Sequence, residues 1–180
     1  GWRFTKGIEF TFPSNTVLAP NGYTVVAANR DAFMARYPDV TNFSAGFAPP
    51  VHSHVQLENA QGEVVSELHF SNEGDWATRI LTTNGFSFYG HWGWTWRAEH
   101  DGLGSSLELI NPALGTGLPP NWGTSLAGGT PGRANSLFSA DAAPIITSVA
   151  HSPVIPQPAD SVTVSARIID ERTNGLVASV

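Results

Sequence analysis

Short segments of alternating apolar and polar residues recur along the chain, and turn-forming residues separate them. In "GIEFTF", Ile8, Phe10 and Phe12 fall on one side of an extended backbone, and the segment 161–168 repeats the alternation. A period of two is the period of a β-strand, in which successive side chains point to opposite faces. The 18 glycines and 13 prolines supply turn chemistry between these segments. The pattern predicts an all-β fold.

One segment, "NRDAFMARYPD", departs from this alternation. Its apolar residues recur at helical spacing from Phe33 to Tyr37. Asn29 or Asp31 is suited to cap the N-terminus of a helix, because a short polar side chain can accept a hydrogen bond from a free backbone N–H there. Pro38 would end the helix. We therefore expect one short helix.

A hairpin is predicted between residues 51 and 70. Two alternating runs, Val51 to Leu57 and Val64 to Phe70, flank a turn at Gly62. A further strand is expected in "SSLEL" (105–109), where both leucines should face the interior and Glu108 should face solvent.

Charge and composition exclude several classes of partner. The net charge is -6, and only nine Lys and Arg residues are present, without a cluster. Binding to nucleic acid or to anionic membranes depends on basic patches, so we expect neither. No apolar stretch approaches the roughly 20 residues of a membrane-spanning helix, which argues against membrane insertion. The chain has no cysteine, which excludes disulfides and thiolate metal sites.

Four stretches, taken in order, resemble bacterial lamin tail domains, which are immunoglobulin-like β-sandwiches of large exported proteins. The stretches are "GW" (1–2), "FTFPSNTVLAPNGYTVVAANRDAF" (10–33), "VQLENAQGEVV" (55–65) and "SSLELINP…NWGTS…GGTPGRANS" (105–136). The resemblance covers residues 1–136. A linker is expected at 137–143, and residues 144–180 look like the start of a second immunoglobulin-like or fibronectin-like domain.

The resemblance implies a non-catalytic interaction, adhesion or accessory module of a multidomain bacterial protein. Its location would be extracellular or at the cell surface, and its partner a protein or a glycan there. The strands that the family places before "GW" are missing, so we expect a fragment that is cut inside the first sandwich and again inside the second. The alternative functions are a carbohydrate-binding module, or an appendage of an enzyme whose catalytic domain lies outside this sequence.

An aromatic stretch, "HWGWTWRAEHDG" (91–102), offers the candidate binding site. Tryptophans at every second position of a strand share a face and lie about 6.6 Å apart, which lets successive sugar rings stack on them. Alternatively, the same indoles could cover the core of the sandwich. The candidate ligand-binding residues are Trp92, Trp94, Trp96, Arg97, His100 and Asp101.

Several carboxylates lie in or near this stretch. A glycosidase needs two carboxyl groups about 5 to 10 Å apart, and the candidates are Glu73, Asp75, Glu99, Asp101 and Glu108. The sequences "EGDW" and "EHDGLG" are, however, typical of turns, in which Asp accepts local backbone hydrogen bonds. Arg79 and Arg97 could pair with these carboxylates. We predict no catalytic residue and no enzyme activity.

Histidines in the predicted hairpin form a third candidate site. His52 and His54 would share a face of one strand, and His69 lies on the paired strand. Three imidazoles within reach of one another could bind zinc or copper. Exposed polar residues are also common where a strand begins. We assign no metal and no cofactor from the sequence.

Overall fold

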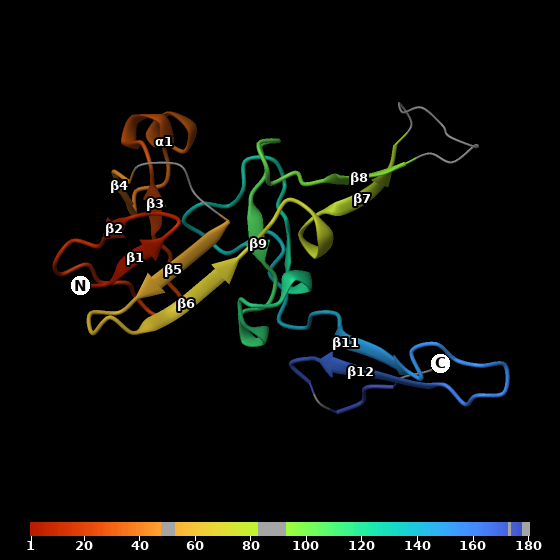
Figure 1. The fold of residues 1–180 in the computed structure, drawn as a ribbon. Coiled ribbons are helices and arrows are strands. Elements are labelled where there is room, and N and C mark those ends of the chain that lie inside the picture. Colours follow the sequence, from red (N-terminus) through yellow and green to blue (C-terminus); the bar gives the residue numbers. More distant parts are fainter. Residues whose placement is uncertain (48–52, 83–92, 173, 178–180) are drawn as a thin grey trace.

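The computed structural model describes residues 1–47, 53–82, 93–172 and 174–177 (Figure 1). Strands dominate this part of the chain, and its single α-helix is α1 (Arg30–Arg36). The predicted all-β fold is confirmed. The sheets are small: one has four strands, and four others have two strands each. Within the described residues, all pairs except β3–β4 are antiparallel.

The largest sheet has the order β2-β1-β5-β6. Its strands are β1 (Arg3–Lys6), β2 (Phe10–Thr11), β5 (His54–Glu58) and β6 (Val64–His69). The predicted hairpin is confirmed as β5–β6, and Gly62 lies in its turn with a φ of 84°. The strand expected in "GIEFTF" is reduced to β2, because the chain bends at Gly7. A Cβ there would lie 2.3 Å from the carbonyl oxygen of His54, so only glycine fits.

The predicted helix is also confirmed, between β3 (Val25–Ala27) and β4 (Phe43–Ala45). Asn29 is its N-cap, and the side-chain oxygen accepts a hydrogen bond of 2.9 Å from the backbone N–H of Ala32. The helix ends before Pro38. Its Phe33 ring packs against Phe43, with 4.8 Å between the centroids. This contact fixes α1 against the parallel β3–β4 pair.

The other pairs form the second half of the described chain. They are β7 (Thr78–Leu81) with β8 (Trp94–Arg97), β9 (Leu107–Leu109) with β10 (Trp122–Thr124), and β11 (Ile145–Ser152) with β12 (Thr163–Ile169). Three 3-10 turns accompany them: Gly74–Trp76, Pro112–Leu114 and Pro119–Asn121. Before β11, the segment expected as a linker contacts residues that follow β12. Asp141 pairs with Arg172 at 3.0 Å, and the N–H of Ala142 donates to Glu171 at 2.9 Å.

Polar side chains occupy the most buried positions around β9 and β10. Glu108, Asn111, Asn121 and Ser125 are buried, while Leu107 and Leu109 are only half-buried. The expectation that Glu108 faces solvent is therefore wrong. The reason is that a later segment, residues 125–139, folds over this face of β9. We call residues 125–139 the closing segment.

Glu108 holds the closing segment through its carboxylate. Thr130 Oγ1 donates to one oxygen, while the backbone N–H and the hydroxyl of Ser136 donate to the other, both at 2.7 Å. Burial raises the pKa of the Glu108 carboxyl, but the hydrogen bonds outweigh burial and hold the pKa below its ordinary value. Asn135 adds a bond from its side-chain amide to the carbonyl of Leu109 at 2.9 Å. The carboxylate is thus a structural group that joins two distant parts of the chain.

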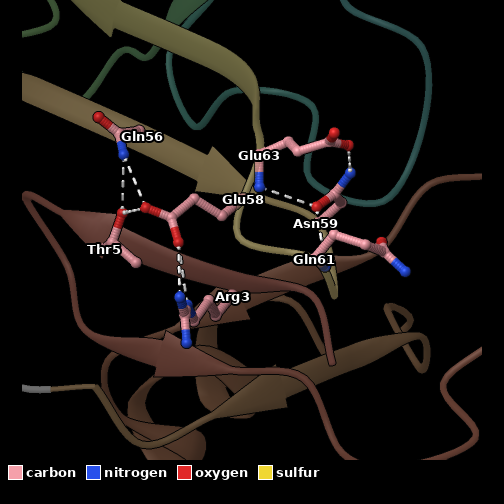
Figure 2. A network of polar contacts seen from close by, with 7 residues as sticks. All are labelled: Arg3, Thr5, Gln56, Glu58, Asn59, Gln61 and Glu63. Atoms are coloured by element: carbon pink, nitrogen blue, oxygen red, sulfur yellow. Dashed lines mark hydrogen bonds and ion pairs between the residues drawn. The ribbon is translucent and has the colours of Figure 1, made fainter.

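A second polar network joins β1 to β5 (Figure 2). The Arg3 guanidinium donates twice to Glu58, at 2.8 and 3.0 Å, and Thr5 and Gln56 each donate to its other oxygen at 2.9 Å. The bond from Arg3 holds the pKa of the Glu58 carboxyl below its ordinary value. A depressed pKa means that the ionised carboxylate stabilises the fold, and that this stabilisation disappears as the pH falls through the folded-state pKa.

The substitution Glu58→Gln is therefore expected to cause a small decrease in the thermal unfolding midpoint at about pH 7. The decrease should shrink at an acidic pH below the folded-state pKa, where the wild-type carboxylate is also protonated. Circular dichroism melts at the two pH values measure this. Glu9→Gln, which changes an exposed carboxylate in the turn between β1 and β2, is the control. An equal decrease at both pH values would show that shape, rather than charge, matters at residue 58.

Candidate functional site

The β7–β8 hairpin places two of the candidate tryptophans on one face. Its register pairs Arg79 with Trp96 and Leu81 with Trp94. Opposite residues of an antiparallel pair project to the same side, and so do residues two apart on a strand. These four side chains therefore share one face, which we call the aromatic face (Arg79, Leu81, Trp94 and Trp96).

The aromatic face is open to solvent. Trp94 is 58% exposed, Trp96 43% and Leu81 46%. The Arg79 guanidinium carbon lies 5.0 Å from the centroid of the Trp94 ring, a cation–π contact that holds the indole in place. In Figure 1 the hairpin projects away from the four-stranded sheet. The alternative in which these indoles cover a core is wrong for Trp94 and Trp96, while Trp92 lies outside the described residues.

Two other tryptophans pack against each other. Trp76 and Trp122 are half-buried and pack against each other, with 6.3 Å between their ring centroids. The indole N–H of Trp122 donates to the carbonyl of Thr116 at 2.9 Å, which satisfies its polar atom. Trp76 and Trp122 thus take a packing role near the base of the hairpin, whereas Trp94 and Trp96 are exposed, as is Trp2 at the start of the chain.

Arg97, at the end of β8, does not belong to the aromatic face. It pairs in register with Thr78, one position out of phase with the tryptophans, so its side chain leaves from the opposite face. Its guanidinium forms an ion pair with Glu99. The sequence-based expectation that Arg97 pairs with a nearby carboxylate is confirmed. Arg79, expected to do the same, stacks on Trp94 instead.

His100 and Asp101 lie in the turn that follows β8, and they line a separate polar pocket of about 450 Å³. The Nε2 atom of His100 is 3.0 Å from the carbonyl oxygen of Ser71, and Asp101 accepts a 2.7 Å hydrogen bond from the side chain of Asn72. The Nδ1 atom of His100 is buried and has no hydrogen-bond partner among the described residues. The structure thus divides the candidate residues between two places rather than one site.

Three of the five carboxylates considered for catalysis already have structural partners. Glu99 pairs with Arg97, Asp101 accepts from Asn72, and Glu108 is covered by the closing segment. A general acid or base must reach its substrate, and the burial of Glu108 keeps it from doing so.

No helix in the described parts of the chain combines the length and the apolar character needed to cross a bilayer. Comparison of the sequence with protein-family models and with curated proteins, and of the fold with solved structures, found no match.

Proposed function

We propose that this chain is a non-catalytic binding module that holds a glycan against the aromatic face. The observation that carries the proposal is the exposure of Trp94 and Trp96 on one side of a hairpin, with Arg79 packed on the first indole. Exposed apolar groups gathered on one face cost solvation energy, and they commonly mark a binding surface.

The chemistry of the aromatic face fits a sugar. A pyranose ring presents apolar C–H groups on its faces and hydroxyls around its edge. Indole faces can pack against the C–H groups, while the guanidinium of Arg79 is close enough to donate to hydroxyls at the rim. The spacing of Trp94 and Trp96 along β8, about 6.6 Å, allows contact with neighbouring sugar units.

The cellular setting is part of the same proposal. The order of the stretches that resemble lamin tail domains, from residues 1–2 to 105–136, supports an immunoglobulin-like sandwich within an exported multidomain protein. The many strands and the small antiparallel sheets are compatible with that architecture. A glycan at a cell surface is then the partner that this module would meet.

The substitution Trp94→Ala is expected to weaken glycan binding by about 30-fold, the effect of losing roughly 2 kcal/mol at a central aromatic contact. A polysaccharide array identifies the ligand, and calorimetry with the wild type and the variant then gives the affinities. Arg79→Ala should produce a smaller loss, because it removes the group that positions the indole.

Two control variants separate the aromatic face from general effects. Thr95→Ala changes the opposite face of β8, and Trp2→Ala removes an exposed indole from another part of the chain. Both should bind like the wild type. Absence of binding to every polysaccharide, or equal affinity of Trp94→Ala and the wild type, contradicts the proposal. Capture of a protein that depends on Trp94 would replace the glycan with a protein partner.

A further inference from the structure

A second cluster of chemically active side chains lies on the β5–β6 hairpin. The register pairs His54 with His69 and Gln56 with Glu67. Opposite residues share a face, and so do residues two apart, so His54, Glu67 and His69 all project from the same side. His52, also considered from the sequence, lies outside the described residues. Glu67 is not among the residues expected from the sequence, although its spacing of two residues from His69 places both side chains on one face of the strand.

The backbone pairing brings the two imidazoles close together. The N–H of Phe70 donates to the carbonyl of Ser53 at 2.8 Å, which makes the adjoining His54 and His69 a non-hydrogen-bonded pair. In such pairs the Cα atoms are only about 4.5 Å apart and the side chains approach most closely. Accordingly, the rings stack with 3.8 Å between centroids and 18° between planes.

The possible ligand atoms converge on one point. Glu67 Oε1 lies 2.7 Å from His54 Nε2 and 3.4 Å from His69 Nε2. One ligand atom from each residue lies within 4.8 Å of the other two. In a tetrahedral zinc site, with bonds of about 2.0 to 2.2 Å, neighbouring ligand atoms are about 3.4 Å apart. An imidazole binds a metal in its ring plane, so the stacked rings must turn out of their parallel arrangement about their side-chain bonds to share one ion.

Access and charge also suit a cation. The side chains are 28% exposed at His54, 45% at Glu67 and 69% at His69, so an ion can enter and keep water ligands. The carboxylate of Glu67 provides an acidic group beside the two imidazoles, 2.7 Å from His54 Nε2. The Thr116 hydroxyl donates to the backbone carbonyl of Glu67 at 3.1 Å, which anchors this part of β6.

We propose that His54, Glu67 and His69 bind one divalent transition-metal ion of the class of Zn²⁺ or Cu²⁺, with water in the remaining positions. Two imidazole nitrogens and one carboxylate oxygen match these ions, whereas Ca²⁺ and Mg²⁺ prefer oxygen ligands alone. The site is separate from the aromatic face, and its test does not depend on glycan binding.

The experiment titrates the full chain with Zn²⁺ and then with Cu²⁺ in an isothermal calorimeter. One ion per chain is expected, with tighter binding of Cu²⁺, as the order of affinities for divalent metals requires. His69→Ala and Glu67→Gln should each weaken binding by about 10- to 100-fold or more, because even partners outside the coordination shell contribute that much. Electron paramagnetic resonance of the Cu²⁺ complex should show coupling to two imidazole nitrogens.

Control variants separate loss of metal binding from general effects on the protein. His151→Ala removes an exposed histidine from β11 and should leave the affinity unchanged. If His69→Ala fails to fold by circular dichroism, His69→Gln keeps a polar side chain at the position while removing the imidazole. No measurable binding by the folded wild type, or binding that survives the double change of His54 and His69 to glutamine, would overturn the proposal.

Discussion

Glu108→Gln is expected to lower the free energy of unfolding by about 3 kcal/mol at neutral pH, since hydrogen bonds to a charged group contribute about 1.5–3 kcal/mol each. The carboxylate accepts from Thr130 and from both the backbone and the hydroxyl of Ser136. A glutamine has only one acceptor oxygen. Its NH₂ group would meet the donors on the other side.

The loss of unfolding free energy should be larger at neutral pH than at acidic pH. The pKa of Glu108 is depressed in the folded protein, so its charge stabilises the fold above the unfolded-state pKa. That contribution disappears as the pH falls through the folded-state value. The difference in unfolding free energy between wild type and variant should therefore narrow below about pH 4.

Urea unfolding of both proteins over a range of pH gives these free energies. Glu9→Gln, which alters an exposed carboxylate, serves as the control and should change the curve very little. A variant as stable as the wild type at neutral pH would mean that the closing segment is held by other contacts. If the difference in unfolding free energy stays constant on acidification, the charge of the Glu108 carboxylate does not contribute to stability.

Asn121→Ala is also expected to lower the free energy of unfolding by about 3 kcal/mol, because it leaves buried backbone groups unpaired. Asn121 is only 1% exposed. Its amide donates to the carbonyls of Asn111 at 2.7 Å and Gly115 at 2.9 Å, and its oxygen accepts from the N–H of Asn111 at 3.0 Å. Alanine can make none of these bonds.

The same urea experiment measures this loss, with Asn72→Ala, the removal of an exposed amide, as the control. Asn121→Asp is informative as well. It keeps an acceptor for the N–H of Asn111 but places a carboxylate against two carbonyl oxygens, so it should be at least as destabilising as alanine. If Asn121→Asp were instead stable, the side chain would have to be hydrated in solution.

Local signals explain which elements could be predicted from the sequence. The α-helix followed from a cap at Asn29 and a stop at Pro38, and the β5–β6 hairpin followed from a turn at Gly62. Each signal acts within a few residues. The bend at Gly7 was missed, because the carbonyl that forbids a side chain there belongs to His54, far along the chain.

Long-range contacts explain what could not be predicted. Alternation in "SSLEL" gives two faces but does not show which one another segment covers, so Glu108 was placed on the wrong side. In the same way, the spacing of the tryptophans predicted a shared face, while the exposure of that face depends on where distant segments of the chain pack. Arg79 joins the aromatic face through strand register, and Glu67 joins His54 through register and His69 through a spacing of two residues on one strand.

The closing segment also determines how this chain would carry mechanical load. A force that pulls on the chain beyond Ser139 acts first on β9 and the residue after it. The N–H of Ser139 donates to the carbonyl of Ile110, and the N–H of Ser136 donates to the carboxylate of Glu108. Strand β10 lies further back along the chain and is reached later. Tension applied to the chain beyond Ser139 would thus be borne by a carboxylate and its donors before it could peel β10 from β9.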